Sequence, residues 1–518
     1  MEIKIANYTV SVTQQTDLRQ AVIKKYAIPA DDIVDYKILR CSIDARKRDD
    51  ILYNYQFYLN LKKEYPHLLA LPNIALAKPQ PILEYPQWSQ QLPPVVIGFG
   101  PAGMFAALYL ARCHARPIII ERGSEIEKRK DEVANFLNNK QLNENSNIQF
   151  GEGGAGAFSD GKLTTNINSE WIDFVLQEFY QHGATEDVTY MSNPHVGTDY
   201  LEIVVKNMRK EIQSLGGTFY FNTVFTDYKK EKEQIKILCN NNLEFDTHHL
   251  LLCLGHSARD TIRTLFDKGL KMEPKSFSMG VRIEHLQSKI NKMQYGRFAP
   301  FLPPASYKGV VHLKGRSVYT FCMCPGGSVM ASASEEKSIV TNGMSNKKRD
   351  GINANAALLV GINPSDFFVD NPLDGLSYQE KYERMAFAIS GDYKAPCNLL
   401  AEFMTNKPAT AARSIIPSYP HGVIYCQLDR CLPSYVVRSI REAIPLLNKK
   451  LKGFQDEDAV LTGIETRSSS PIRILRDENR MSTVSGIYPV GEGAGYAGGI
   501  TSAAIDGLKT AMQISDGR

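Results

Sequence analysis

Three glycines between residues 95 and 107 have the spacing that binds phosphate through backbone groups. An apolar run, Val95-Val96-Ile97, leads into a G-x-G-x-x-G pattern that is followed by an alanine-rich segment. In this pattern the first glycine permits a tight turn, the second lets backbone approach a pyrophosphate, and the third lets a helix pack on the strand. The helix would offer free N–H groups and a partial positive charge to the phosphates. The segment predicts an adenine-dinucleotide site with contacts from Gly98, Gly100, Pro101, Ala102 and Gly103.

A second apolar run ends at a carboxylate in the position that suits a ribose. Pro117 to Ile120 reads as a strand, and Glu121 follows 18 residues after Gly103, with Arg122 next to it. A carboxylate at the end of this strand suits the ribose hydroxyls of an adenosine. A glycine-rich turn in an unrelated α/β protein is the alternative, but it would not explain the strand, glycines, helix, strand and acid in this order.

The carboxyl-terminal segment favours FAD over NAD. A strand at residues 486–490 leads into a glycine loop carrying Glu492, and a helix of small residues follows. This arrangement resembles the second flavin-binding motif of two-dinucleotide-fold flavoproteins, which usually have Asp where this chain has Glu492. The resemblance implies that the acid contacts the ribityl or phosphate region and that the helix start faces the flavin ring. The residues expected to hold the flavin end are Gly491, Glu492, Gly498, Gly499, Ile500 and Thr501.

Two shorter segments lie between these motifs in the order that a flavoprotein would have. The run at 250–254 ends at Gly255, and the run at 216–224 reads as the third strand of the sheet, with the backbone of Val224 at the adenine. Each alone is explained equally well as a buried strand with a terminal turn. Their order along the chain favours FAD.

A glycine-rich loop spans residues 151–161, with Lys162 directly after it. Glycine backbone can approach a cofactor closely and donate its N–H groups, so Gly153, Gly154 and Lys162 are expected to contact the flavin or its pyrophosphate. The alternative interpretation is a flexible surface loop or lid.

Three side chains are candidates for catalysis. Cys324 ends a strand beside Pro325-Gly326-Gly327, Arg467 could hold a substrate carboxylate through its forked guanidinium, and His285 could donate a proton. The alternatives are a small buried cysteine, a structural ion pair and a core histidine. No Cys-x-x-Cys pair follows the first glycine motif, which argues against a disulfide reductase, and no His/Cys spacing predicts a metal.

The chain resembles a poorly characterised bacterial family of FAD-dependent dehydrogenases over nearly its full length. The resemblance rests on the glycine-rich stretch at 150–163, the segments at 278–285 and 324–327, the run at 465–473 and the terminal glycine loop. It implies FAD and redox chemistry and names no substrate. More distantly, the layout is similar to glutathione-reductase-type folds and to tRNA-modifying flavoproteins of the glucose-inhibited-division type.

The predicted fold class is α/β, with a Rossmann-type FAD-binding domain, an inserted α+β substrate domain and a small N-terminal α+β module. The module and a proline-bearing linker take residues 1–90. The FAD-binding domain takes residues 91–260 and 456–518, and the substrate or cap domain takes residues 261–455. Three domains are a reasonable number for 518 residues.

Composition excludes several classes of protein. With 60 Lys plus Arg against 56 Asp plus Glu, the net charge of +4 argues against a dedicated nucleic-acid binder. No apolar run reaches the roughly 18 residues of a membrane span, and nine scattered cysteines favour a reduced, cytoplasmic setting. The expected activity is hydride transfer between FAD and a small organic substrate, with any NAD(P)H binding transiently or elsewhere. The alternatives are a tRNA-modifying flavoprotein, a flavin-binding redox sensor without catalysis, and a saturase or desaturase of a carboxylic or terpenoid substrate.

Overall fold

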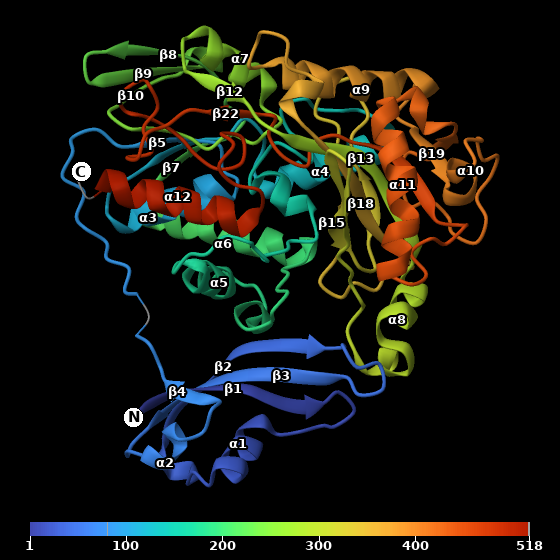
Figure 1. The fold of residues 1–518 in the computed structure, drawn as a ribbon. Coiled ribbons are helices and arrows are strands. Elements are labelled where there is room, and N and C mark those ends of the chain that lie inside the picture. The colour runs from blue at the N-terminus through green and yellow to red at the C-terminus, as the bar shows by residue number, and fades with distance from the viewer. Residues whose placement is uncertain (80, 516–518) are drawn as a thin grey trace.

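Five short parallel strands form the sheet from which the predicted glycine loops emerge. Figure 1 labels two of these strands, β5 and β7. The computed structural model describes residues 1–79 and 81–515. The strand order is β23-β11-β5-β6-β7, with every neighbouring pair parallel. The bounds are Val95–Ile97 for β5, Ile118–Ile120 for β6, Thr218–Tyr220 for β7, Leu250–Leu252 for β11 and Ile487–Pro489 for β23. These are the strands that the apolar runs predicted.

Helices cover one face of this sheet and a small second sheet covers the other. On the first face lie α3 (Pro101–Arg112), α5 (Ile172–Gln181), α6 (Thr198–Ser214) and α12 (Ile500–Ser515), which share a core with β5, β6 and β11. On the second face lie α7 (Arg259–Asp267) and an antiparallel sheet of β8 (Phe225–Glu231), β9 (Gln234–Cys239) and β10 (Glu244–Thr247). The parallel strands are therefore buried on both sides, which explains their continuous apolar sequences.

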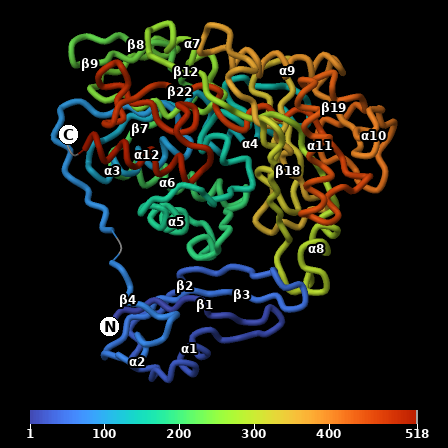
Figure 2. The backbone as a smooth tube through the Cα atoms, in the orientation of Figure 1, coloured from blue at the N-terminus to red at the C-terminus, as the bar shows by residue number. Residues whose placement is uncertain are grey.

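A seven-stranded sheet forms the second large part of the molecule, with the order β14-β15-β18-β13-β21-β19-β20. Its strands are antiparallel except for the parallel pair β19 and β20. The bounds are Phe277–Leu286 for β13, Val310–Leu313 for β14, Arg316–Cys324 for β15, Asn353–Ile362 for β18, Ala395–Leu399 for β19, Val423–Tyr425 for β20 and Val460–Glu465 for β21. Helix α11 (Ser434–Lys450) packs on this sheet. Figure 2 shows the path of the chain through both parts.

Shorter elements connect or flank the two large sheets. The strands β16 (Ser328–Ala331) and β17 (Thr341–Met344) form one pair, and β12 (Met272–Pro274) and β22 (Ile472–Ile474) form another. The remaining α-helices of these two parts are α4 (Ile126–Asn139), α8 (Gln287–Tyr295), α9 (Asp374–Ser390) and α10 (Leu400–Met404).

The return from the second part to the parallel sheet lies later in the chain than the predicted boundary at residue 456. Strand β21 belongs to the seven-stranded sheet, between β13 and β19, although the sequence analysis placed it with the FAD-binding residues. All six residues of β21 are buried, and an apolar strand of this kind does not reveal which sheet it joins.

The first 76 residues form a separate four-stranded antiparallel sheet with the order β2-β3-β1-β4. Its elements are β1 (Glu2–Ser11), α1 (Leu18–Tyr26), β2 (Ile33–Asp44), β3 (Leu52–Leu61), α2 (Pro66–Leu69) and β4 (Ile74–Leu76). This is the β-α-β-β-α-β arrangement. Helix α1 begins after Asp17, whose Oδ1 accepts from the Gln20 N–H at 3.0 Å. The module touches the rest of the chain where Cys41 exchanges backbone hydrogen bonds with Tyr190 and Ser192.

Among the described residues, no helix is both long and apolar enough to span a bilayer. In the same part of the chain, no cluster of three or more His, Cys, Asp or Glu side chains could hold a metal ion.

Candidate functional site

A cavity of about 950 Å³ opens at the carboxyl ends of β5, β6 and β11 and extends to the seven-stranded sheet. Ligands of open α/β sheets bind at this end of the strands. Fourteen of the predicted cofactor-binding residues line it: Gly98, Gly100, Pro101, Ala102, Glu121, Arg122, Gly154, Lys162, Val224, Gly255, Glu492, Gly498, Gly499 and Ile500. Residues far apart in the sequence therefore meet at one cavity.

The first glycine loop needs glycine for different reasons at its three positions. Gly98 has a φ of +94°, and a Cβ there would lie 2.6 Å from the Cys253 carbonyl oxygen. A Cβ on Gly103 would lie 2.0 Å from the Gly98 carbonyl oxygen, because α3 packs directly on the loop. At Gly100 a Cβ would meet only the Cα of Gly154, at 3.6 Å, among the residues that the structure describes. Gly100 therefore leaves room on the cavity side.

The other four predicted cofactor-binding residues do not line the cavity but lie in the segments that carry its lining. They are Gly103, Gly153, Gly491 and Thr501. The Gly153 N–H donates to the Phe99 carbonyl at 2.8 Å, which joins the glycine-rich loop to the first glycine loop. The Thr501 hydroxyl donates to the Leu163 carbonyl at 2.7 Å and joins the start of α12 to the segment that carries Lys162.

Glu121 lines the cavity, but its carboxylate also ties three loops together. One oxygen accepts from the Phe99 N–H at 2.8 Å, and the other accepts from the N–H groups of Gly123 and Gly151, both at 3.0 Å. Each of these donors would otherwise be buried without an acceptor. The sequence predicted a ribose ligand here and did not foresee this bracing of the loops.

The buried Arg129 holds the glycine-rich loop in shape, and sequence reasoning missed it. Its guanidinium donates to four backbone carbonyls, those of Asn147, Ile148, Glu152 and Gly154, at 2.6–3.0 Å. Burial lowers the pKa of Arg129 to about 10, so the group remains charged at neutral pH. A basic residue within the charged helix α4 gave no sequence signal for this function.

Glu492 lies in the cavity wall beside His256 and Lys275. Its Oε1 is 3.7 Å from the His256 Nδ1. Burial raises the pKa of Glu492 to about 7, an effect that the positive charge of Lys275 opposes. Burial and the nearby Arg467 and Arg259 lower the pKa of His256 to about 3, so this imidazole is neutral near pH 7.

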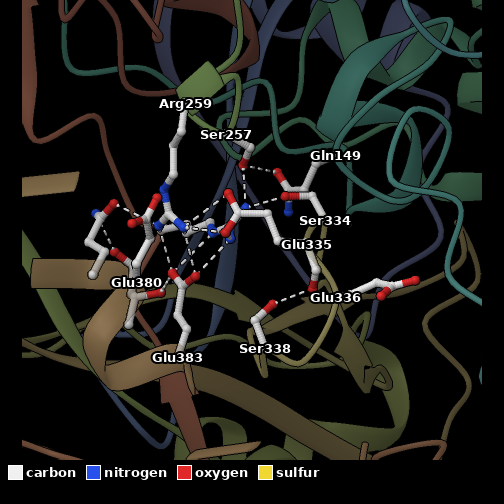
Figure 3. A network of polar contacts seen from close by, with 12 residues as sticks. Gln149, Ser257, Arg259, Ser334, Glu335, Glu336, Ser338, Glu380 and Glu383 are labelled. Atoms are coloured by element: carbon white, nitrogen blue, oxygen red, sulfur yellow. Dashed lines mark hydrogen bonds and ion pairs between the residues drawn. The ribbon is translucent and has the colours of Figure 1, made fainter. Parts of the chain in front are cut away.

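Arg467, the predicted carboxylate ligand, reaches the cavity but is already engaged. Figure 3 shows Ser257, Ser334 and Glu383, which belong to the cluster of polar contacts around it. Its Nε and Nη2 donate to the two Glu383 oxygens at 3.1 and 2.7 Å, and its Nη1 donates to the hydroxyls of Ser257 and Ser334 at 3.0 and 2.5 Å. The same carboxylate receives Arg259 through two further hydrogen bonds of 2.8 and 2.9 Å. The cluster therefore braces the junction of α7, α9 and the segment after β21.

The other two predicted catalytic side chains do not line the cavity. Cys324 is fully buried, and burial raises the pKa of its thiol to about 12, which opposes formation of a thiolate. His285 is also buried, and its Nε2 hydrogen-bonds the Phe454 carbonyl at 2.8 Å. The structure places both side chains in the packing of the seven-stranded sheet.

Two further predicted contacts have partners within the chain. Arg122 pairs with Asp260 and stacks over the Phe150 ring with a centroid distance of 4.4 Å. The Val224 N–H donates to the Asn240 side-chain oxygen at 2.9 Å. Both residues nevertheless line the cavity.

The cavity wall has the features that a dinucleotide with a pyrophosphate requires. Two helices, α3 and α12, begin at its edge, so their unpaired N–H groups favour negative charge there. Among the described residues, nothing lies within 4 Å of a Cβ added to Gly255, Gly498 or Gly499, so backbone is open to the cavity at these points. The residues present therefore fit an adenine dinucleotide such as FAD.

Comparison with known proteins supports FAD as the cofactor. Residues 276–468 match the family described as "FAD-dependent protein, C-terminal domain-like". Residues 2–59 match a domain of unknown function, DUF8436. An uncharacterized protein from Clostridium beijerinckii (strain ATCC 51743 / NCIMB 8052) is 44% identical over 525 residues, which is 99% of this chain and 98% of that protein.

Solved structures of flavoproteins resemble the chain only remotely. CtdE in complex with FAD is 12% identical with a TM-score of 0.32, over 83% of this chain and 88% of that one. The halogenase PltM is 9% identical with a TM-score of 0.37, over 82% of this chain and 68% of that one. Similarities this weak carry no argument about fold or function.

Proposed function

We propose, from the premise that the chain belongs to one family with the Clostridium beijerinckii protein, that it is an FAD-dependent oxidoreductase. Its substrate is a small organic molecule that shares the cavity with the flavin. The observation that carries the proposal is the cavity itself, in which a glycine-lined wall faces a wall of polar and apolar side chains.

The parallel sheet and its helices would be a Rossmann-type FAD-binding domain, with the seven-stranded sheet as the substrate domain. The strand order β7-β6-β5-β11-β23 places the glycine loop after the central strand, as in dinucleotide-binding folds. Gly98 and Gly100 would face the pyrophosphate, and Glu121 and Val224 would lie at the adenosine end. Gly498 to Ile500, at the start of α12, would lie at the flavin end.

FAD, when bound, supplies the capacity to accept or donate a hydride. The chain's residues would hold the substrate against the ring, exclude water and control protons. Glu492, whose pKa lies near 7, is the group on the cavity wall with which the chain could hold a proton near neutral pH, and the neutral His256 lies beside it. NAD(P)H would bind transiently as an electron donor.

The test is the absorbance spectrum of the purified protein, followed by NADH or NADPH in the absence of oxygen. We expect a stoichiometric flavin spectrum that bleaches when the reductant is added. A flavin spectrum that persists would remove NAD(P)H as donor and leave reduction to the organic substrate. A colourless protein that FAD cannot reconstitute would overturn the proposal.

A further inference from the structure

Most cations on the cavity wall already have a carboxylate partner. Arg467 pairs with Glu383, and Arg122 pairs with Asp260. Among the described residues, Lys275 forms no ion pair, and its positive charge only opposes the rise in the pKa of Glu492, which lies on the same wall. Lys308 is exposed at the edge of the cavity. The arginines of this wall are therefore neutralised by carboxylates, whereas its lysines are paired less fully.

The floor at the seven-stranded sheet is also electrically balanced. Arg282 is fully buried beneath it and donates to both Glu465 oxygens at 2.5 and 3.2 Å. Its remaining N–H groups donate to the Cys322 carbonyl and to the side-chain oxygens of Asn342 and Asn355 at 2.8–3.1 Å. All five donors of this guanidinium are used, so it has none left for a ligand.

Lys162 differs from the arginines of the wall. Its nearest carboxylate is Asp160, with 3.8 Å between the Lys162 Nζ and the Asp160 Oδ2. The two Asp160 oxygens are already taken by Arg349, at 3.1 and 2.5 Å, and by the Ser345 hydroxyl. Within residues 1–79 and 81–515, the Lys162 ammonium makes no hydrogen bond, and its side chain is only 26% exposed. Arg349 and Asp160 neutralise each other, so the charge of Lys162 is left unbalanced.

The backbone holds Lys162 in place without help from its side chain. Lys162 forms an antiparallel β-bridge with His195, and the Leu163 N–H donates to the Pro194 carbonyl at 2.9 Å. The Leu163 carbonyl accepts from Thr501 at the start of α12. The ammonium therefore lies on a fixed segment between the predicted flavin end and the seven-stranded sheet. A fixed, half-buried ammonium with three unused donors suits an anionic oxygen.

Apolar side chains line the same cavity. Phe321 and Ile167 line it with 39% and 41% of their surfaces exposed, and Met323 and Val340 line it from β15 and from the residue before β17. Exposed apolar groups at the rim of a cavity favour the apolar part of a ligand.

We propose that the substrate is a carboxylic acid with an apolar body and that Lys162 binds its carboxylate. A monoanion matches the one positive charge of the Lys162 ammonium. This inference rests on the proposed function, since it places the acid in the cavity shared with FAD. The sequence analysis expected Lys162 to contact the cofactor and Arg467 to bind a substrate carboxylate. The proposal instead assigns the substrate carboxylate to Lys162.

The test is titration calorimetry of the full-length protein with benzoate and hexanoate and with their neutral amides, benzamide and hexanamide. The variants are Lys162→Gln, the charge-retaining Lys162→Arg, and Lys314→Gln as a control at an exposed lysine outside the cavity. Flavin content and melting temperature are measured on the same samples. Loss of the charged contact should weaken carboxylate binding by at least about tenfold in Lys162→Gln. Lys162→Arg and Lys314→Gln should bind within a few-fold of wild type.

The proposal also requires that wild type prefer each acid over its amide and that Lys162→Gln lose this preference while it keeps FAD. Equal binding of acid and amide, or no binding of either acid to wild type, would overturn it. Loss of FAD from Lys162→Gln would assign the lysine to the cofactor and would also overturn it. If wild type holds no flavin, the proposed function fails, whereas the preference for acid over amide still decides the role of Lys162.

Discussion

The two ends of the cavity are built from different parts of the chain. At the parallel sheet the wall is mostly backbone, formed by glycines and by the starts of α3 and α12. At the seven-stranded sheet it is formed by side chains whose charges are fixed by buried partners such as Glu383 and Arg282. Backbone can approach a phosphate closely where a residue has no Cβ. A buried charged side chain instead needs an oppositely charged partner and hydrogen bonds for its remaining polar atoms. The end at the parallel sheet therefore depends on glycines, which have no Cβ, and the end at the seven-stranded sheet depends on buried ion pairs.

This difference predicts that substitutions at the two ends fail in different ways. A side chain added at the glycine end should remove the cofactor and leave the fold intact. A side chain removed from the charged end should destabilise the fold. The predictions below are ordered by the expected change in the free energy of unfolding.

The largest change is expected for Glu383→Ala. The carboxylate is completely buried between Arg259 and Arg467, which hold its pKa far below the ordinary range. Its removal leaves two buried guanidinium groups uncompensated and should lower the free energy of unfolding by about 3–5 kcal/mol. Denaturant unfolding followed by fluorescence measures this change.

The matched control is Glu380→Ala, one turn earlier in α9. Glu380 pairs with the partly exposed Arg263, with 2.6 Å between its Oε1 and the Arg263 Nη2. An ion pair of this kind contributes at most about 1 kcal/mol. If the two variants lost the same stability, the buried cluster would not be the brace that the structure indicates.

The same contrast explains what the sequence could predict. The glycine loop, β5, β6 and Glu121 lie within 27 residues, so a local pattern identifies them. The partners of the charged end are distant in sequence, with 183 residues between Arg282 and Glu465 and 124 between Arg259 and Glu383. No local sequence pattern connects residues so far apart. The sequence could therefore predict that Arg467 lies at the site, but it could not predict that Glu383 is its partner.

Buried strands posed a similar difficulty for the fold. Strands β21 and β11 are both completely buried, yet one joins the seven-stranded sheet and the other the parallel sheet. Cys324 and His285 are catalytic candidates in the sequence because a thiol and an imidazole can take part in catalysis. Both side chains are buried in the core of the structure. Side-chain chemistry is readable from sequence, whereas exposure depends on packing that distant segments supply.

A small loss of stability with a large loss of cofactor is expected for Gly100→Val. Gly100 has φ of −82° and ψ of −175°, a conformation that valine adopts without strain. The added methyl groups would extend into the cavity, where only the Gly154 Cα lies near the Cβ. FAD content, measured by absorbance after gel filtration, should fall by at least about tenfold, with a change of less than about 1 kcal/mol in unfolding free energy.

Gly361→Val in β18 is the control for this variant. A Cβ there meets nothing closer than the Ser317 carbonyl oxygen at 3.8 Å, and the residue does not line the cavity. This variant should keep its FAD. Stoichiometric FAD in Gly100→Val would remove the pyrophosphate from the first glycine loop.

The smallest expected effect is a change in how stability depends on pH. It concerns Glu492, the acid at the glycine end of the cavity whose side chain accepts no hydrogen bond from the described residues. Burial raises the pKa of Glu492 from its ordinary value near 4.5 to about 7 in the folded protein, although 28% of the side chain is exposed to the cavity. The folded state thus holds this proton more tightly than the unfolded state does. Its contribution to stability is complete below pH 4.5 and is lost as the pH rises through 7.

Glu492→Gln has no proton to lose, so its melting temperature should fall less between about pH 5 and about pH 8 than that of wild type. Glu478→Gln removes an exposed carboxylate from the turn before β23 and should follow wild type. Equal pH slopes for Glu492→Gln and wild type would mean that the carboxylate is already ionised at the lower pH. In that case a cation close to it, such as Lys275, would stabilise the charge, and the glycine end would depend on paired charges just as the other end does.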